Sequence, residues 1–289
     1  MTEDVEKEPQ RADPHDIDRL DMSRPTVART YDALLGGKDN FQPDRDAAVA
    51  VEEINPGSTQ LCHENRAFLS RGVRHVAGLG IRQFIDLGSG LPTVENTHQV
   101  AQSVAPDTSV VYVDIDPIVL SHGRAILADT PGTSVVTADI RDVDSVMSAE
   151  ETRRLIDPSQ PVCLMLVSLL HCIPDEDGPF DVVRGYLDRL PAGSALVYSH
   201  LCASDVEAGR TFTRRVHELG MDWGRIRSPE ECAQAFDSLE IVSPSTDGTA
   251  PRVLVDCDTW RNGDIEPRPR PTPPEKKIWE HAGVGIKRA

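Results

Sequence analysis

Short apolar strands and helical segments alternate through most of this sequence, and that alternation is the feature that most constrains its fold. Predicted strands cover residues 83–87, 109–114, 134–138, 162–169 and 194–200, and predicted helices cover residues 94–104, 117–129, 149–156 and 180–190. Strands that alternate with helices in this way form parallel sheets with right-handed crossovers. The segment 162–169 is the most apolar strand, as expected where helices cover both faces of a sheet. The chain is therefore predicted to have an α/β fold.

Two helical patterns precede the first strand. Residues 23–37 (SRPTVARTYDALLGG) predict a helix that Ser23 caps and that Gly36 and Gly37 end. Residues 58–79 predict a longer helix with one apolar face, stopped by Gly80. The acidic, polar residues 1–18 are predicted to be disordered. We expect one domain over residues 19–289, with a helical N-terminal region at 19–80 and an α/β core at 81–289.

The C-terminal part leaves the last strand open. Helices are predicted at residues 205–219 and 229–237 and a strand at 239–243, and the Pro-rich stretch 266–274 must be an extended loop. Residues 252–256 (RVLVD) have the composition of a strand, but residues 279–287 (WEHAGVGIK) also alternate. Periodicity does not choose between these two segments.

The strongest chemical signal is the glycine loop in FIDLGSGLPT, residues 84–93. Gly88 and Gly90 allow a tight turn and a close approach of the backbone to a ligand, directly after a strand that ends near Asp86. Asp114 ends the second strand, where a carboxylate accepts hydrogen bonds from ribose hydroxyls. Asp139 follows the third strand, where it would accept one from an adenine amino group. A glycine loop followed by these two acids predicts an adenosine-containing cofactor.

Residues around the loop distinguish between adenosine cofactors. A dinucleotide motif would have a third glycine at position 93, where Thr93 stands, and Pro92 removes a backbone donor that a pyrophosphate would need. Asp86 would repel a pyrophosphate but suits the ammonium group of S-adenosylmethionine. The sequence also has no Tyr-x-x-x-Lys pair and no nucleoside triphosphate loop. S-adenosylmethionine is therefore the predicted cofactor.

Several segments together resemble a known family. FIDLGSGLPT, VVYVDIDPIVL, VTADIRD and LMLVSLLHCIPD resemble the nucleotide-binding motifs of class I S-adenosylmethionine-dependent methyltransferases, and RPTVARTYDALLGGKDNFQPDR and HENRAFLSRGV resemble the N-terminal blocks of the bacterial S-adenosyl methyltransferases, formerly a domain of unknown function. The resemblance spans residues 24–287. It implies a Rossmann-like, mostly parallel seven-stranded sheet with an antiparallel last strand, and it favours residues 279–287 as that strand. The sequence departs from the pattern at Pro92, where the superfamily has a glycine, and at Ile286, where arginine is usual.

These motifs supply the expected cofactor contacts. Arg66, in the helix before the first strand, would pair with the cofactor carboxylate, the alternative being a surface ion pair. The other expected contacts lie at the carboxyl ends of the strands: Asp86, Gly88, Ser89, Gly90, Asp114, Ile115, Asp139, Ile140, Val167 and Ser168.

Three residues are candidates for catalysis. His171 follows the fourth strand and His200 ends the fifth, so either would orient or deprotonate an acceptor; the alternative is that both hydrogen-bond within their own loops. Tyr31 belongs to an N-terminal block that we interpret as a lid hinged at its glycines, the alternative being a helix that only packs on the sheet edge. Asp175 is predicted to cap the next helix. Because a sulfonium already carries its leaving group, a general base is needed only for an acceptor that is protonated at neutral pH.

Composition limits the partners. The sequence has 30 Lys and Arg against 47 Asp and Glu, a net charge of −17, which disfavours nucleic acid and anionic membranes as partners. The apolar run at 162–170 is far shorter than the roughly 20 residues of a membrane span. The six cysteines form no C-x-x-C pair, so no metal site is predicted, and reduced core thiols indicate a cytoplasmic protein.

We therefore predict an S-adenosylmethionine-dependent methyltransferase with a small-molecule acceptor. The alternatives are a protein that binds this cofactor or S-adenosylhomocysteine without transferase activity, a protein methyltransferase with an open groove, and a nicotinamide-dependent oxidoreductase. The sequence leaves open the acceptor atom and the oligomeric state.

Overall fold

The computed structural model describes residues 21–92, 95–116, 118–119, 130–263, 266–269 and 276–288. The predicted disordered tail at 1–18 lies outside these residues. So do Thr93, nearly all of the predicted helix 117–129 and most of the Pro-rich loop.

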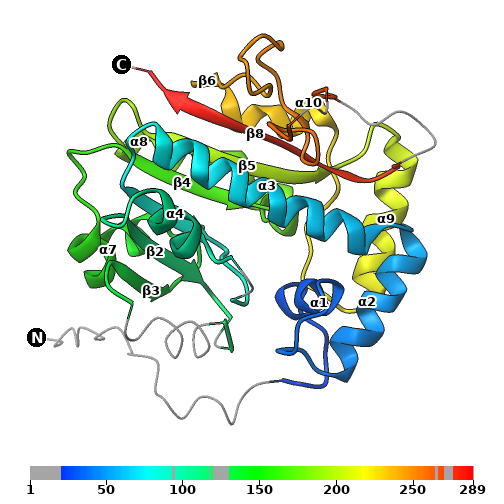
Figure 1. The fold of residues 1–289 in the computed structure, drawn as a ribbon. Coiled ribbons are helices and arrows are strands. Elements are labelled where there is room, and N and C mark those ends of the chain that lie inside the picture. The colour runs from blue at the N-terminus through cyan, green and yellow to red at the C-terminus, as the bar shows by residue number, and fades with distance from the viewer. Residues whose placement is uncertain are drawn as a thin grey trace, which may run out of the picture.

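A mixed sheet of eight strands forms the centre of the molecule (Figure 1). Its main path runs in the order β3-β2-β1-β4-β5-β8-β6. The first five strands pair in parallel, and β8 lies antiparallel between β5 and β6. These strands are β1 (Gln83–Leu87), β2 (Ser109–Asp114), β3 (Thr133–Thr137), β4 (Val162–Val167), β5 (Ala195–Cys202), β6 (Leu239–Ile241) and β8 (Trp279–Lys287). The predicted α/β class and the antiparallel last strand are confirmed.

The ambiguity over the last strand is resolved in favour of β8. It pairs with β5 along its length, from Ile286 opposite Ala195 to Trp279 opposite Cys202. Within the competing segment 252–256, only Val255–Asp256 forms a strand, β7. It pairs with β8 and is the eighth strand of the sheet, outside the main path. The family resemblance therefore identified the last strand correctly, whereas periodicity left the two segments open.

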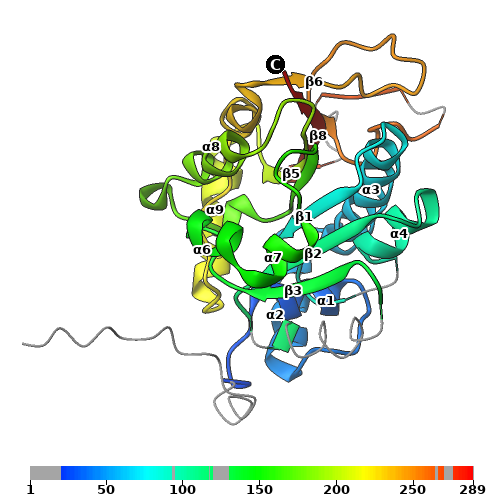
Figure 2. The same cartoon turned by 90° about the vertical axis from the view of Figure 1, so that its left-hand side faces the viewer.

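Helices cover both faces of the sheet (Figure 2). One face carries α3 (Ser58–Gly78) and α4 (Thr97–Val104), and the other carries α6 (Val143–Ser148), α7 (Glu150–Leu155) and α8 (Pro179–Arg189). Alternate residues of β4 enter the two cores: Cys163 and Met165 pack on the α3 side, and Leu164 and Leu166 on the α8 side. Both faces of β4 are thus buried, which explains its uninterrupted apolar sequence.

Three further helices gather at one end of the sheet: α1 (Val27–Leu34), α2 (Gln42–Ile54) and α9 (Val206–Glu218) (Figure 1). They share an apolar cluster that includes Val51 of α2 and Phe212 of α9.

Local signals fix where α1 begins and ends. The residue that caps α1 is Thr26, whose hydroxyl accepts a hydrogen bond from the backbone of Arg29, so the prediction of Ser23 as the cap is wrong. Gly36 has φ +74°, the left-handed conformation that ends a helix, as predicted. The helix α2 was not predicted.

Besides the helical residues 118 and 119, the remaining helical segments of the described chain are short. They are the α-helix α10 (Pro229–Cys232) and the 3₁₀ turns η2 (Leu170–Cys172), η3 (Asp175–Asp177) and η4 (Ala233–Phe236). All six cysteines are free, and five of them are buried, as expected of core thiols. Within the described part of the chain, no helix is both long and apolar enough to cross a membrane.

Candidate active site

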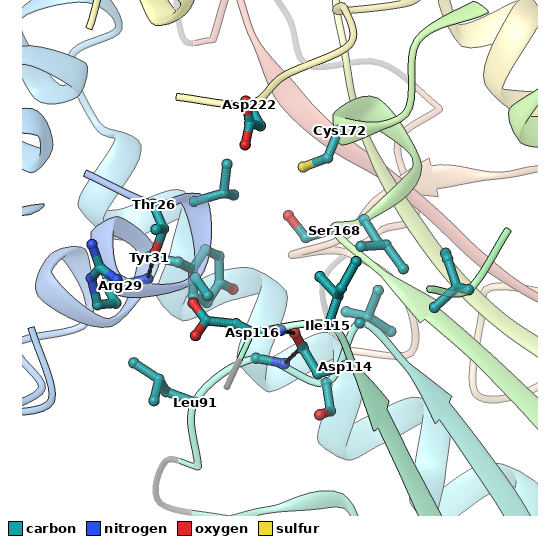
Figure 3. Close-up of a pocket in the computed structure, with 18 of the residues that line it drawn as sticks. Thr26, Arg29, Tyr31, Leu91, Asp114, Ile115, Asp116, Ser168, Cys172 and Asp222 are labelled. Atoms are coloured by element: carbon teal, nitrogen blue, oxygen red, sulfur yellow. Dashed lines mark hydrogen bonds between the residues drawn. The ribbon is translucent and has the colours of Figure 1, made fainter. Parts of the chain in front are cut away.

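A cavity of about 850 Å³ lies where the parallel strands end, between these ends and α1. Figure 3 shows Tyr31 of α1 on one side and Asp114, Ile115 and Ser168 of the sheet on the other. Every residue predicted to contact the cofactor lines this cavity, and so does Tyr31. The predicted cofactor contacts and Tyr31 therefore share one cavity.

The glycine loop turns beneath the cavity as the motif predicts. The backbone amides of Gly88 and Ser89 donate to the carbonyl oxygen of Val113, at 2.8 and 3.2 Å. Gly88 has φ +63°, and a Cβ at this position would lie 2.4 Å from Leu169 Cδ1. At Gly90 (φ +65°) a Cβ would meet no atom within 4 Å, because this part of the loop faces open space. The loop thus needs glycine for its own packing at 88 and exposes its backbone at 90.

Asp114 connects the loop to the second strand. Its Oδ2 accepts a hydrogen bond from the backbone of Gly90 and its Oδ1 accepts one from the backbone of Asp116, both at 2.9 Å (Figure 3). A carboxylate has about four lone-pair sites, so Asp114 keeps two for the hydroxyls of a ribose. Burial raises its pKa above the usual value, and the backbone donors oppose that shift.

An acid and a base lie together at the other end of the loop. Asp86 accepts a hydrogen bond from Thr97 Oγ1 at 2.7 Å, and burial raises its pKa to about 6 while Thr97 and Arg66 act in the opposite direction. Arg66 donates to the carbonyl oxygen of Glu95 at 3.3 Å and forms no salt bridge to any residue of the described chain. Its guanidinium is therefore available to a ligand carboxylate, and the Asp86 carboxylate to an ammonium group.

The segments after the second and third strands supply an acid and an apolar wall. Both oxygens of Asp139 accept hydrogen bonds from Arg141 Nε, at 3.0 and 2.9 Å, and Arg141 also pairs with Asp177. Asp139 can accept a further hydrogen bond from an adenine amino group only by sharing its lone pairs with Arg141. Ile115 and Ile140 also line the cavity, and the 63% exposure of Ile115 gives an apolar face for a flat ring.

Polar side chains connect α1 to the sheet through hydrogen bonds. The Tyr31 hydroxyl donates to the carbonyl oxygen of Cys62 at 3.2 Å and accepts from Asn65 Nδ2 at 3.1 Å. Ser199 Oγ donates to Asn65 Oδ1 at 2.7 Å and accepts from the backbone of Ser168 at 3.0 Å. Ser168 has φ +57°, an uncommon conformation for a residue other than glycine and one that concentrates at functional sites. Burial keeps the pKa of Tyr31 well above its usual range, so this phenol stays protonated and is no base.

His171 is buried and is not among the residues that line this cavity. Its Nδ1 accepts a hydrogen bond from the backbone of Leu201 at 3.3 Å, and the ring packs against Trp223 with centroids 4.6 Å apart. Burial, with His200 and Arg227 nearby, keeps the pKa of His171 well below its usual value. The ring is therefore neutral and carries its proton on Nε2.

His200 does not face the cleft, and that expectation is wrong. Its side chain is fully buried, and both ring nitrogens are engaged. Nδ1 donates to the carbonyl oxygen of Leu201 at 2.7 Å, and Nε2 accepts from Arg227 Nη1 at 3.2 Å. These contacts give His200 a structural explanation.

Asp175 caps no helix, contrary to prediction. The residue before α8 is Gly178, in the left-handed conformation (φ +58°). The Asp175 carboxylate instead accepts from Arg225 Nε at 2.6 Å and from Arg227 Nη2 at 2.7 Å. The Asp175 carboxylate therefore binds two arginines that are distant in sequence, in place of the backbone amides at a helix start.

Comparison with known proteins gives the family. The family model described as S-adenosyl methyltransferase matches residues 13–288. This chain belongs to that family. A crystal structure from Thermobifida fusca YX, provisionally assigned as a methyltransferase, is 44% identical, with coverage of 93% of this chain and 97% of that one and a TM-score of 0.82. A DUF574 family protein from Streptomyces avermitilis MA-4680 is 34% identical, with coverage of 92% and 99% and a TM-score of 0.79. No curated protein matches the sequence.

The enzyme is thus an S-adenosylmethionine-dependent methyltransferase with a class I, Rossmann-like fold and S-adenosylmethionine as its cofactor. The cavity fits this cofactor in size and in donor set. Arg66 lacks an acidic partner in the described chain, Asp86 is a buried acid, and the Asp114 carboxylate faces the cavity over the open backbone of Gly90. These groups match the carboxylate, the ammonium and the ribose of the cofactor respectively.

A second, smaller cavity of about 70 Å³ adjoins the first. Val27, Tyr31, Ser168 and Trp223 line both. Most of the other residues around the small cavity are apolar: Leu34, Val51, Leu61, Leu201, Phe212, Val216, Met221 and Ile278. Its polar lining includes His171 and Glu280. Sequence reasoning missed Trp223 and Glu280, and nothing local in the sequence marks either as a site residue.

Proposed function

We propose that this enzyme transfers a methyl group to a small molecule that binds in the second cavity. The observation that carries this proposal is the wall of four residues shared by the two cavities, Val27, Tyr31, Ser168 and Trp223. A cavity of about 70 Å³ admits a group of a few heavy atoms and not a folded surface. Its apolar lining with few polar groups is typical of small-molecule sites.

We assign the cofactor contacts as follows. Arg66 holds the carboxylate, Asp86 the ammonium group and Asp114 the ribose hydroxyls. Asp139 lies where the adenine amino group would be, shared with Arg141. Bound S-adenosylmethionine supplies an activated methyl group, so the protein accelerates transfer chiefly by aligning the acceptor and excluding water.

The helix α1 serves as the cover of the site in this proposal. Its Val27 and Tyr31 line both cavities. Asp44 of α2 fixes its position: this fully buried carboxylate accepts from Arg29 Nε at 2.8 Å and from the backbone of Thr26 at 3.0 Å. We propose that α1 and α2 close over the acceptor as one unit.

The experiment uses S-adenosylmethionine labelled in its methyl group. A bacterial extract is separated by ultrafiltration into small molecules and macromolecules, and the enzyme is incubated with each fraction. We expect label in the small-molecule fraction, with strongly reduced transfer by the Asp114→Asn variant as a control for the site. Label confined to the macromolecules would contradict the proposal. So would absence of transfer to either fraction by a protein that S-adenosylhomocysteine stabilises against heat.

A further inference from the structure

Glu280 is the least expected residue in the small cavity. It lies near the start of β8, opposite Leu201 of β5, and its side chain is only 2% exposed. One carboxylate oxygen, Oε1, accepts a hydrogen bond from the Ser168 hydroxyl. The other, Oε2, is buried and has no hydrogen-bond partner in the described chain. An unpartnered buried acceptor of this kind is costly, so it calls for a ligand that donates to it.

The described residues of the small cavity offer no positive charge to Glu280, although the nearby His200 ring and the hydroxyls of Ser168 and Ser199 oppose the effect of burial on its pKa. Among the described residues that line the small cavity, Glu280 is the sole carboxylate, and no lysine or arginine is present. His171 is neutral, and burial raises the pKa of the Cys62 thiol, so that it stays protonated. Burial correspondingly raises the pKa of Glu280 to about 7. A buried carboxylate stays ionised at neutral pH only when it is paired, so a cationic ligand would compensate this charge and satisfy Oε2 at the same time.

Trp223, which lines the same cavity, carries a hydrogen-bond donor that lacks an acceptor among the described residues. Its indole Nε1 is a buried donor without a hydrogen-bond partner in the described chain. The ring lines both cavities and packs on His171. A ligand with both a cationic group and an acceptor oxygen would satisfy Glu280 and Trp223 together. At roughly 10–15 Å³ for each water-sized sphere, the cavity has room for about five heavy atoms.

We propose that the methyl acceptor is a small, mostly apolar amine, held as its ammonium ion by Glu280, with an ether or carbonyl oxygen directed to Trp223. This rests on the proposed function, since it names the class of small molecule that the second cavity takes. An alcohol would donate a hydrogen bond to Glu280 but would bring no charge, and the buried carboxylate would stay uncompensated. Glu280 is thus assigned both recognition of the acceptor and acceptance of its proton.

The proton transfer balances with the reaction of the family. Glu280 Oε2 takes one N–H proton of the ammonium, which frees the nitrogen lone pair. That pair forms the new N–CH₃ bond while the carbon–sulfur bond breaks, with its electrons going to sulfur. S-adenosylhomocysteine and the methylated ammonium result, and Glu280 releases its proton to solvent.

The experiment measures binding to the complex with S-adenosylhomocysteine. The probes are four molecules of equal size: methoxyethylamine, n-butylamine, methoxyethanol and n-butanol. Calorimetry and melting temperatures are recorded for the wild type, for Glu280→Gln, and for the control variant Glu218→Gln, whose carboxylate is about 55% exposed on α9. Glutamine preserves the shape of Glu280 and an oxygen that accepts from Ser168.

We expect the two amines to bind the wild type and the control variant, methoxyethylamine more tightly, and neither alcohol to match them. Glu280→Gln should bind S-adenosylhomocysteine as the wild type does but should bind the amines about ten to a hundred times more weakly, as loss of a charged hydrogen bond predicts. Amine binding that Glu280→Gln leaves unchanged would overturn the proposal. Alcohols that bind as tightly as amines, or no bound amine on a protein that binds S-adenosylhomocysteine, would overturn it as well. In all of these cases the proposed function stands, because it fails only if labelled methyl groups reach no small molecule.

Discussion

Replacement of Asp114 tests the assignment of the cofactor site most directly. The carboxylate already accepts two backbone hydrogen bonds, from Gly90 and from Asp116, both at 2.9 Å. Its remaining lone pairs face the cavity and would accept from the ribose hydroxyls. Hydrogen bonds to a charged group contribute about 1.5–3 kcal/mol, so losing the ribose contact should weaken cofactor binding about 10- to 150-fold.

Two substitutions separate binding from folding. Asp114→Asn keeps the shape and one acceptor oxygen, so only one of the two backbone amides loses its acceptor; the variant should lose affinity at the smaller end of this range and melt roughly 2–4 °C below the wild type. Asp114→Ala leaves the amides of Gly90 and Asp116 without their acceptor. At about 1 kcal/mol for each hydrogen bond, and about 2–4 °C per kcal/mol in a domain of this size, its melting temperature should fall by roughly 4–8 °C.

The assay is calorimetric titration with S-adenosylhomocysteine, together with a melting curve of each free protein. Asp107→Asn is the matched control, because Asp107 has a side chain that is 76% exposed and pairs with the surface residue Arg82, at 3.3 Å. The control should bind as the wild type does. If Asp114→Asn melts within about 4 °C of the wild type and binds S-adenosylhomocysteine with unchanged affinity, Asp114 does not hold the ribose and the reasoning from the glycine loop is refuted.

Three further predictions concern other charged groups. Because burial raises the pKa of Asp86 to about 6, its ionised form prevails only above that pH. The affinity for S-adenosylmethionine should therefore fall as the pH drops through 6, by up to about tenfold per pH unit. In binding titrations from pH 5 to 8, Asp86→Asn should remove most of this pH dependence. Arg66→Met should weaken binding of S-adenosylhomocysteine about tenfold or more and leave binding of methylthioadenosine, which lacks the amino acid group, unchanged; equal losses for both ligands would argue against a carboxylate contact. Asp44→Ala removes the partner of the buried Arg29, so it should lower the free energy of unfolding by about 3–5 kcal/mol and the melting temperature by roughly 6–20 °C. A shift of the melting temperature within about 2 °C would show that the ion pair does not hold α1 to α2.

The sequence predicted the part of the site that is local in the chain. Asp86 lies in β1, Gly88 and Gly90 lie in the loop directly after it, and Asp114 ends the next strand, so parallel pairing of β1 with β2 is enough to bring them together. Strand–helix alternation indicates that pairing directly, because sequential parallel strands usually lie side by side.

The helix α2 escaped prediction although it carries recognisable signals. Pro43 stands in its first turn, and the Asp44 carboxylate accepts a hydrogen bond from the backbone of Phe41 at 2.8 Å. Ala47, Ala48 and Val51 form its buried side. This face is small and the rest of the helix is charged, so the apolar periodicity is weak. Proline and an acid in the first turn were the informative features.

Glu280 was not predictable from its own segment. In the alternating sequence of residues 279–287, a glutamate suggests a face exposed to water. In the structure, β8 pairs along both edges, with β5 and β6, and consecutive residues from Trp279 to Gly285 are buried, so both of its faces are covered. Only the register of β8 on β5, which is a long-range contact, determines that residue 280 lies beside Ser168. The positive φ of Ser168 is likewise visible only in the folded chain.

The N-terminal helix α1 and the C-terminal strand β8 meet at this site, and one hydrogen-bonded path connects them. Each donor along the path is matched to an acceptor: Asn65 donates to Tyr31, Ser199 to Asn65, the amide of Ser168 to Ser199, and the hydroxyl of Ser168 to Glu280. Within the described residues of this path, Glu280 Oε2 is the acceptor left over. Tyr31 thus fixes one end of the path and a ligand would complete the other, so α1 is positioned by the same contacts that orient Glu280. It follows that Tyr31→Phe, which removes the hydroxyl that Asn65 donates to, should weaken amine binding although Tyr31 makes no direct contact with the ammonium group. When Tyr31→Phe is combined with Glu280→Gln, the double variant should lose little more amine affinity than Glu280→Gln alone.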